Sequence, residues 1–181
     1  MNLKATMLIL ILAAQGAYAN EFAIVGGPRF DNADSKLTGT TVEARLSFQA
    51  GVLGFLEMGG PNFIRSGFQF GTRAYGIKAG TISLGDARFT NFDLPIGYLY
   101  RFSDYGGAFL GPVISFNFSK DCPGTGCTGV NSTPIGLQVG ASFKIAPQIG
   151  AEVYFETMTS KIAEGIENPK AFVGQFYFSF D

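Results

Sequence analysis

Apolar and polar residues alternate along most of this chain, and the alternation is most regular at 171–180. Every second residue there is apolar, namely Phe172, Gly174, Phe176, Phe178 and Phe180. A period of two places successive side chains on opposite faces of a β-strand. A strand face made almost entirely of phenylalanine is more hydrophobic than a soluble sheet requires, and it indicates a surface that faces lipid.

Seven further stretches show the same alternation, so we expect eight strands. Their ranges are 22–30, 42–58, 64–75, 89–102, 108–118, 135–145, 149–158 and 171–180. Short turns at 59–62, 103–107 and 146–148 alternate with longer loops at 31–41, 78–88, 119–133 and 159–169. Transmembrane barrels combine short periplasmic turns, long external loops and an even number of such strands. The pattern predicts an all-β, eight-stranded antiparallel up-and-down transmembrane β-barrel, in which the last strand pairs with the first.

The polar face of the predicted strands carries charges of both signs in nearly equal number. They are Arg29, Glu43, Arg45, Glu57, Arg65, Arg73, Asp93, Arg101, Lys144, Glu152 and Glu156. The interior of an eight-stranded barrel is just wide enough for side chains to fill it. A buried charge is costly unless it is paired. With the apolar face outside, these side chains predict a plugged, salt-bridged lumen.

Two alternatives to the plugged membrane barrel remain open. A small porin-like channel for ions or small solutes would need an open lumen. A soluble lipocalin-like barrel would turn the apolar face inward around a hydrophobic ligand. Periodicity alone does not say which face points inward. All the charges of the strands lie on one face, which favours the membrane barrel.

The first residues have the pattern of a secretory signal peptide. Lys4 precedes an apolar run at 5–14, and Ala17-Tyr-Ala19 supplies the small residues of a cleavage site. The run is too short to span a bilayer as a helix. We expect cleavage after Ala19, so that residues 1–19 are a signal peptide and residues 20–181 form one barrel domain.

Composition narrows the chemistry that the chain can perform. Lys and Arg nearly balance Asp and Glu, 13 against 14, and no basic cluster indicates a nucleic-acid partner. The sequence contains no histidine, which excludes Ser–His triads and histidine metal sites, and we expect no enzyme activity, metal or cofactor. Cys122 and Cys127, in Cys-Pro-Gly-Thr-Gly-Cys, are expected to form a disulfide in an exported protein.

Several segments carry a resemblance to a known family. They are Phe48-Gln-Ala-Gly51, Phe92-Asp-Leu-Pro-Ile-Gly-Tyr-Leu-Tyr-Arg-Phe102, Gly107-Ala-Phe-Leu-Gly-Pro112, Gly136-Leu-Gln-Val-Gly140 and the aromatic last strand. The chain thereby resembles the small outer-membrane β-barrel family of Gram-negative bacteria, that is, porin-family barrels of the OmpA- and OmpX-like kind.

The resemblance implies a location in the outer membrane but no particular activity. It implies contact with outer-membrane lipid and recognition of the last strand, with Phe172, Phe176, Phe178 and Phe180, by the barrel-insertion machinery. We therefore expect a monomeric barrel with a structural or surface-interaction role through its external loops. The loop that contains both cysteines is the best candidate for a contact surface with an external partner.

Overall fold

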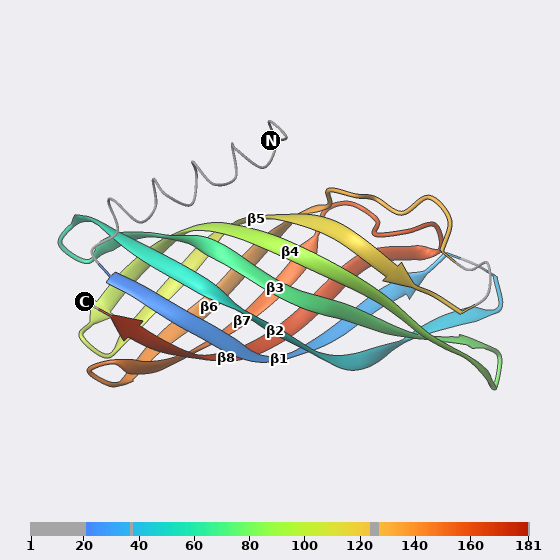
Figure 1. Ribbon diagram of the computed structural model, residues 1–181, viewed down its shortest axis with the longest axis horizontal. Coiled ribbons are helices and arrows are strands. Elements are labelled where there is room, and N and C mark those ends of the chain that lie inside the picture. Colours follow the sequence, from blue (N-terminus) through green and yellow to red (C-terminus); the bar gives the residue numbers. More distant parts are fainter. Residues whose placement is uncertain (1–20, 37, 124–126, 181) are drawn as a thin grey trace.

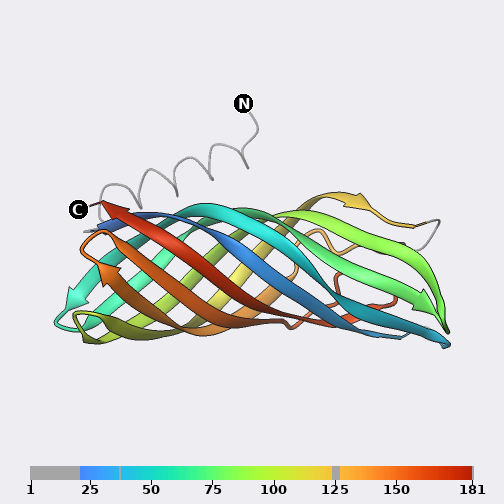
Figure 2. The same cartoon turned by 90° about the horizontal axis from the view of Figure 1, so that it is seen from below.

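The computed structural model describes residues 21–36, 38–123 and 127–180, which form a closed barrel of eight strands. The strands are β1 (Glu21–Ser35), β2 (Thr40–Gly59), β3 (Asn62–Ala79), β4 (Ile82–Ser103), β5 (Gly106–Asp121), β6 (Ile135–Ala146), β7 (Ile149–Met158) and β8 (Ile166–Phe180). Each strand is antiparallel to its neighbours in sequence order, and the strands wind obliquely around an elongated barrel (Figures 1 and 2). The predicted fold class is confirmed. The predicted signal peptide, 1–19, lies outside the described residues.

β8 closes the barrel by pairing with β1. Phe180 is the register partner of Phe22, and Phe172 is the partner of Phe30. The predicted closure of the first strand on the last is therefore confirmed. The end of β8 lies at the same end of the barrel as the short β2–β3, β4–β5 and β6–β7 turns, on the left in Figure 1. We call this the periplasmic end, because short turns mark that side in transmembrane barrels.

The apolar faces of the strands point outward and form what we call the apolar belt. It includes Ile24, Phe30, Leu46, Phe48, Phe70, Ile96, Leu110, Val139, Phe155, Phe172, Phe176 and Phe178, all exposed, with 65% exposure at Phe176. The opposite faces point inward, so Gln175 and Ser179 of β8 are 2% and 1% exposed. A soluble lipocalin-like barrel requires the reverse arrangement, and this exposure pattern excludes it.

Two of the four predicted external loops are mostly strand, which corrects the ranges 31–41 and 78–88. β1 and β2 continue to Ser35 and from Thr40, and β3 and β4 continue to Ala79 and from Ile82. These hairpins extend the barrel at the end opposite the periplasmic turns (Figure 1). The outward residues here include the polar Asn32, Asp34 and Arg88, so the contrast that revealed the other strands weakens while the ladder continues. Gly39 and Gly80, with φ of 78° and 59°, allow the tight turns.

Inward-facing glycines let neighbouring strands approach closely. A Cβ atom added to Gly51 would lie 2.1 Å from the carbonyl oxygen of Phe68, and one added to Gly111 would lie 2.1 Å from that of Ile96. Real side chains do not fit at such distances, so these positions require glycine. The glycine-rich composition thus serves the narrow interior of the barrel.

Candidate functional site

A buried ion pair crosses the lumen between β3 and β7, toward the end of the barrel that carries the short turns. Arg65 Nε and Nη2 donate to Glu152 Oε1 and Oε2 at 3.0 and 2.7 Å, and both side chains are at most 1% exposed. The guanidinium carbon of Arg65 lies 4.3 Å from the centroid of the Phe109 ring. This two-pronged geometry, with a stacked aromatic ring, is the arrangement in which a buried arginine is best compensated.

A second group of charges lies nearer the external end and joins four strands, β1, β3, β4 and β7. Arg29 donates to Asp31 Oδ1 and to Glu156 Oε1, both at 2.9 Å. Arg73 Nη2 donates to Asp93 Oδ2 and to Glu156 Oε1, both at 3.0 Å. All five side chains are at most 2% exposed. Glu156 thus binds both arginines and holds the two halves of the group together.

Hydroxyl groups compensate the surplus of carboxylates in this second group. Asp31, Asp93 and Glu156 face only two guanidinium groups. Ser47 Oγ donates to Asp31 Oδ2 at 2.5 Å, and the Ser115 hydroxyl donates to Asp93 Oδ1. Each hydroxyl supplies a donor to a carboxylate that would otherwise be left partly unsatisfied in a dry interior.

Amide side chains connect the two charged groups. Gln49 Nε2 donates to Gln175 Oε1 at 2.8 Å, and Gln69 Nε2 donates to the same oxygen at 2.9 Å. Gln175 Nε2 then donates to Glu152 Oε2 at 2.7 Å, while Arg29 Nη1 donates to Gln49 Oε1 at 3.0 Å. We call the whole set, from Arg65–Glu152 through these amides to Arg29, Arg73 and Glu156, the lumen network. It crosses the interior from several sides and occupies the space that an open channel would need.

An apolar cluster seals the external end above the lumen network, and we call it the external cap. Its members are Ala33, Tyr75, Ala87, Phe89, Cys127, Ile162, Ala163 and Ile166, none more than 7% exposed. Ile162 and Ala163 come from the β7–β8 connection, and Cys127 comes from the β5–β6 connection, so both loops fold over the mouth. The external end is therefore closed by loops as well as by strand residues.

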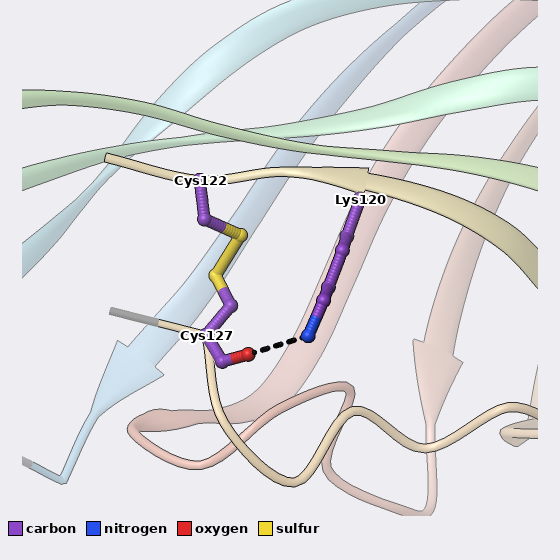
Figure 3. The surroundings of a disulfide bond; sticks show 3 residues. All are labelled: Lys120, Cys122 and Cys127. Carbon is purple, nitrogen blue, oxygen red and sulfur yellow. Dashed lines mark hydrogen bonds between the residues drawn. A yellow bond between two sulfur atoms is a disulfide. The ribbon is translucent and has the colours of Figure 1, made fainter. Parts of the chain in front are cut away.

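The predicted disulfide between Cys122 and Cys127 is present, with a sulfur–sulfur distance of 2.06 Å. Figure 3 shows the bond beside Lys120, whose Nζ donates to the carbonyl oxygen of Cys127 at 3.0 Å. The disulfide and this hydrogen bond hold Cys127 against the end of β5. They thereby fix one member of the external cap.

Charges at the external rim form exposed pairs beyond the apolar belt. Lys78 Nζ lies 2.5 Å from Glu43 Oε1, and Arg45 Nε lies 2.8 Å from Asp86 Oδ1. The hydrogen bond from Lys78 lowers the pKa of Glu43, and the hydrogen bond to Asp86 raises the pKa of Arg45. Glu43 and Arg45 were predicted in the lumen charge network, but they sit above it, at the mouth.

The periplasmic end holds the remaining predicted charges and an open cavity. Arg101 Nη2 donates to Glu21 Oε2 at 2.7 Å, and its guanidinium carbon lies 4.1 Å from the centroid of the Phe63 ring. A cavity of about 630 Å³ is lined by Gly60, Pro61, Phe63, Arg101, Phe102, Ser103, Asp104 and Lys144. Glu57 was predicted in the lumen, yet its side chain is exposed near this end of β2. The inward alternation of β2 ends at Phe55, before the turn.

Six of the eleven predicted charges come together in the buried interior. They are Arg29, Arg65, Arg73, Asp93, Glu152 and Glu156. Asp31 was missed because it was assigned to a loop, although the period of two from Arg29 continues through Asp31 to Ala33. The alternation placed the four buried glutamines Gln49, Gln69, Gln138 and Gln175 on the polar face, in phase with the charges. They were left out of the predicted network because only charged residues were counted.

The described residues include no group of three or more side chains arranged to hold a metal ion. Within residues 21–36, 38–123 and 127–180, no helix is long and apolar enough to cross a membrane.

No protein-family model and no curated protein sequence matches this chain. Solved structures do match it over most of its length. Neisserial surface protein A aligns with a TM-score of 0.55 at 14% identity, covering 88% of this chain and 97% of that one. The chain has the fold of the small outer-membrane β-barrels. The attachment invasion locus protein Ail of Yersinia pestis, solved with the heparin analogue sucrose octasulfate, gives 0.52 at 14% identity, with 88% and 98% covered. OprG from Pseudomonas aeruginosa gives 0.51 at 16% identity, with 92% and 98% covered.

This fold, with apolar side chains outside and a charged interior, suits a lipid environment. An exposed apolar surface that surrounds the whole barrel would be unstable in water but is stable in hydrocarbon. Closed barrels also leave no unpaired strand edge, which is the requirement for β-structure in a bilayer. The barrel is therefore built to lie in a lipid bilayer.

Proposed function

We propose that this outer-membrane barrel is closed to solutes and has a structural or surface-interaction role through its external loops. The observation that carries the proposal is the lumen network. Its guanidinium, carboxylate and amide groups bind one another across the interior, and the external cap covers them. A solute would have to break several buried ion pairs to pass, and breaking a buried pair costs about 3–5 kcal/mol each.

The two longest external connections are bound into one surface, and we propose it as the contact surface for a partner. Thr128 Oγ1 and Glu164 Oε2 lie 2.7 Å apart, and Glu164 N donates to Thr128 O at 3.0 Å. Asn131 N donates to Ile162 O at 2.8 Å. These bonds join the disulfide-bearing connection to the β7–β8 connection. A surface held in this way loses little conformational entropy when it binds.

Charge pairing at the external end argues against a polysulfated partner of the kind named with Ail. Four external cations, Lys36, Arg45, Lys78 and Lys170, each lie within 4 Å of a carboxylate, from Glu167, Asp86, Glu43 and Asp34 respectively. Lys120 and Lys161 have no such carboxylate among the described residues. A polyanion would have to displace those carboxylates. We therefore expect an uncharged or mixed-charge partner at this surface.

The proposal includes the steps that bring the barrel to its membrane. Residues 1–19 act as a cleaved signal peptide, and β8 is the strand that the barrel-insertion machinery recognises. The barrel is a monomer without catalytic residues or a cofactor. The exposed phenylalanines of β8 and the absence of histidine from the sequence support these assignments.

Planar-bilayer recording of the refolded protein tests the closed lumen. We expect insertion, shown by a heat-dependent change of gel migration, without steady ion conductance. A porin of known conductance, refolded and inserted in the same way, is the positive control. Steady conductance in most insertions would contradict the proposal and favour the small channel.

A further inference from the structure

The periplasmic mouth contains charged groups of opposite sign that do not satisfy each other. Lys144 Nζ and the Asp104 carboxylate line the same 630 Å³ cavity. Neither has a hydrogen-bond or ion-pair partner among the residues that the structure describes, and they lie too far apart to pair directly. Asp104 is an exposed residue of the β4–β5 turn and Lys144 is half-buried near the end of β6, whereas the buried charges deeper in the barrel are paired with one another.

The cavity presents these two groups on well-fixed elements. Lys144 lies near the end of β6, and its backbone N–H donates to the carbonyl oxygen of Tyr105 at 2.8 Å. Asp104 precedes Tyr105 in the β4–β5 turn, so the same hydrogen bond fixes the position of the turn relative to β6. The backbone segments that carry the two groups are therefore held next to each other.

A third charge and an aromatic ring form another wall of the cavity. The Arg101 guanidinium stacks on Phe63 and gives one N–H group to Glu21. Arginine carries five donors, and among the described residues only this one hydrogen bond of the Arg101 side chain is found, while the side chain lines the cavity. The backbone N–H of Arg101 donates to the carbonyl oxygen of Pro61 at 2.8 Å, which connects this wall to the β2–β3 turn. The cation is thus oriented rather than free to swing.

We propose that this periplasmic mouth binds a compact zwitterion, with its anionic group at Lys144 and Arg101 and its ammonium group at Asp104. A simple anion would meet Asp104, and a simple cation would meet Lys144 and Arg101. A ligand with both charges satisfies all three. The volume lies within the range of small-molecule sites, which is about 300–1,000 Å³. Two sources share this chemistry, namely the free ends of amino acids and peptides, and the phosphoethanolamine head group of a phospholipid.

The dipeptide alanyl-alanine is the probe, with an acetylated form that lacks the ammonium group and an amidated form that lacks the carboxylate. The refolded full chain is titrated in a maltoside detergent, whose head group is uncharged, and binding is followed by amide shifts in NMR spectra. We expect saturable binding of alanyl-alanine with shifts at Ser103, Asp104 and Lys144. Each blocked form should bind about tenfold more weakly, since each loses a hydrogen bond to a charged group.

Two variants assign the charges. Lys144→Gln should weaken the binding of alanyl-alanine about tenfold. It should leave the binding of the amidated form unchanged, because that form has no carboxylate for Lys144 to bind. Asp104→Asn should likewise weaken the binding of alanyl-alanine, and it should leave the binding of the acetylated form unchanged, because that form has no ammonium group for Asp104 to bind. Lys161→Gln removes a lysine charge at the external end and should bind as the unaltered protein does. All variants are first checked for the heat-dependent gel shift, so that misfolded protein is not scored.

A lipid arm distinguishes the two sources. Binding of alanyl-alanine is compared in bilayers of phosphatidylethanolamine and of phosphatidylglycerol. Loss of peptide binding only in phosphatidylethanolamine assigns the site to the lipid head group, and equal binding assigns it to a soluble ligand. Absence of saturable binding by both alanyl-alanine and phosphoethanolamine would overturn the proposal. Equal binding of the blocked dipeptides, or unchanged binding by Lys144→Gln, would overturn it as well.

Discussion

Arg65 shows how a single charged residue is accommodated inside this barrel. Its side chain is 1% exposed, and Glu152 and the rings of Phe109 and Tyr154 compensate its charge. The pair is strong because two guanidinium nitrogens donate side by side, each to one carboxylate oxygen. Its contribution to stability is nevertheless best seen by breaking it, since an intact buried pair gains little over an apolar replacement.

We predict that Glu152→Gln lowers the free energy of unfolding by about 3–5 kcal/mol, because it leaves the Arg65 charge buried and unpaired. Urea unfolding in lipid vesicles, followed by circular dichroism, measures the change. The control is Glu167→Gln, which breaks the exposed pair with Lys36 and should cost at most about 1 kcal/mol. The double replacement of Arg65 by Met and Glu152 by Leu should cost less than Glu152→Gln alone. Equal losses from Glu152→Gln and Glu167→Gln would contradict a dry lumen.

The two faces of β8 have different roles, because its side chains alternate between the lumen and the lipid. Its inward residues supply Gln175 to the lumen network, and its outward phenylalanines supply the apolar belt. Phe176 lies four residues from Phe180 and thus, for a tilted strand, about 10 Å deeper in the membrane. The free-energy cost of a charged side chain on the lipid-facing side depends on its depth in the bilayer.

We predict that Phe176→Lys destabilises the inserted barrel by about 2–4 kcal/mol, the cost of a lysine near the bilayer midplane. Phe180→Lys, in the same strand and on the same face, should cost about 0–1 kcal/mol because it lies near the periplasmic interface. Reversible unfolding in vesicles by guanidinium measures both. If the two variants lost the same stability, the orientation of β8 across the bilayer would be wrong.

For the molecule as a whole, the lumen network and the external cap are two separate barriers in series. The network consists of side chains on the strands, whereas the cap depends on loop residues such as Ile162, which is fully buried. A defect in the cap should therefore loosen the external surface without opening the barrel.

We predict that Ile162→Glu makes the β7–β8 connection sensitive to trypsin at Lys161 while bilayer recordings remain silent. Burial of a carboxylate in the cap is costly, so the loop should detach. Ile82→Glu, at the exposed tip of the β3–β4 hairpin, is the matched control and should change neither property. Steady conductance from Ile162→Glu would show that the cap, and not the network, closes the lumen.

The sequence was enough for the strand number, the closure of β8 on β1, the disulfide and the choice of lumen-facing charges in the middle of the strands. Each of these depends on a period of two or on a short spacing, and both are visible along the chain. The missed Asp31 and the misassigned loops share one cause. In these extensions polar residues such as Asn32, Asp34 and Arg88 stand on the outer face, so the alternation loses contrast although the strand pairing continues.

Partner choice inside the lumen came only from the folded barrel. Nothing along the chain indicates that Arg65 pairs with Glu152, 87 residues away, or that Glu156 holds both Arg29 and Arg73. Such pairs depend on the register and tilt of all eight strands together. The position along the barrel axis is equally a property of the whole. Glu43 and Arg45 lie at the external rim, and Lys144 lies at the periplasmic mouth. Charges that follow the same alternation but lie between these two ends are buried and paired.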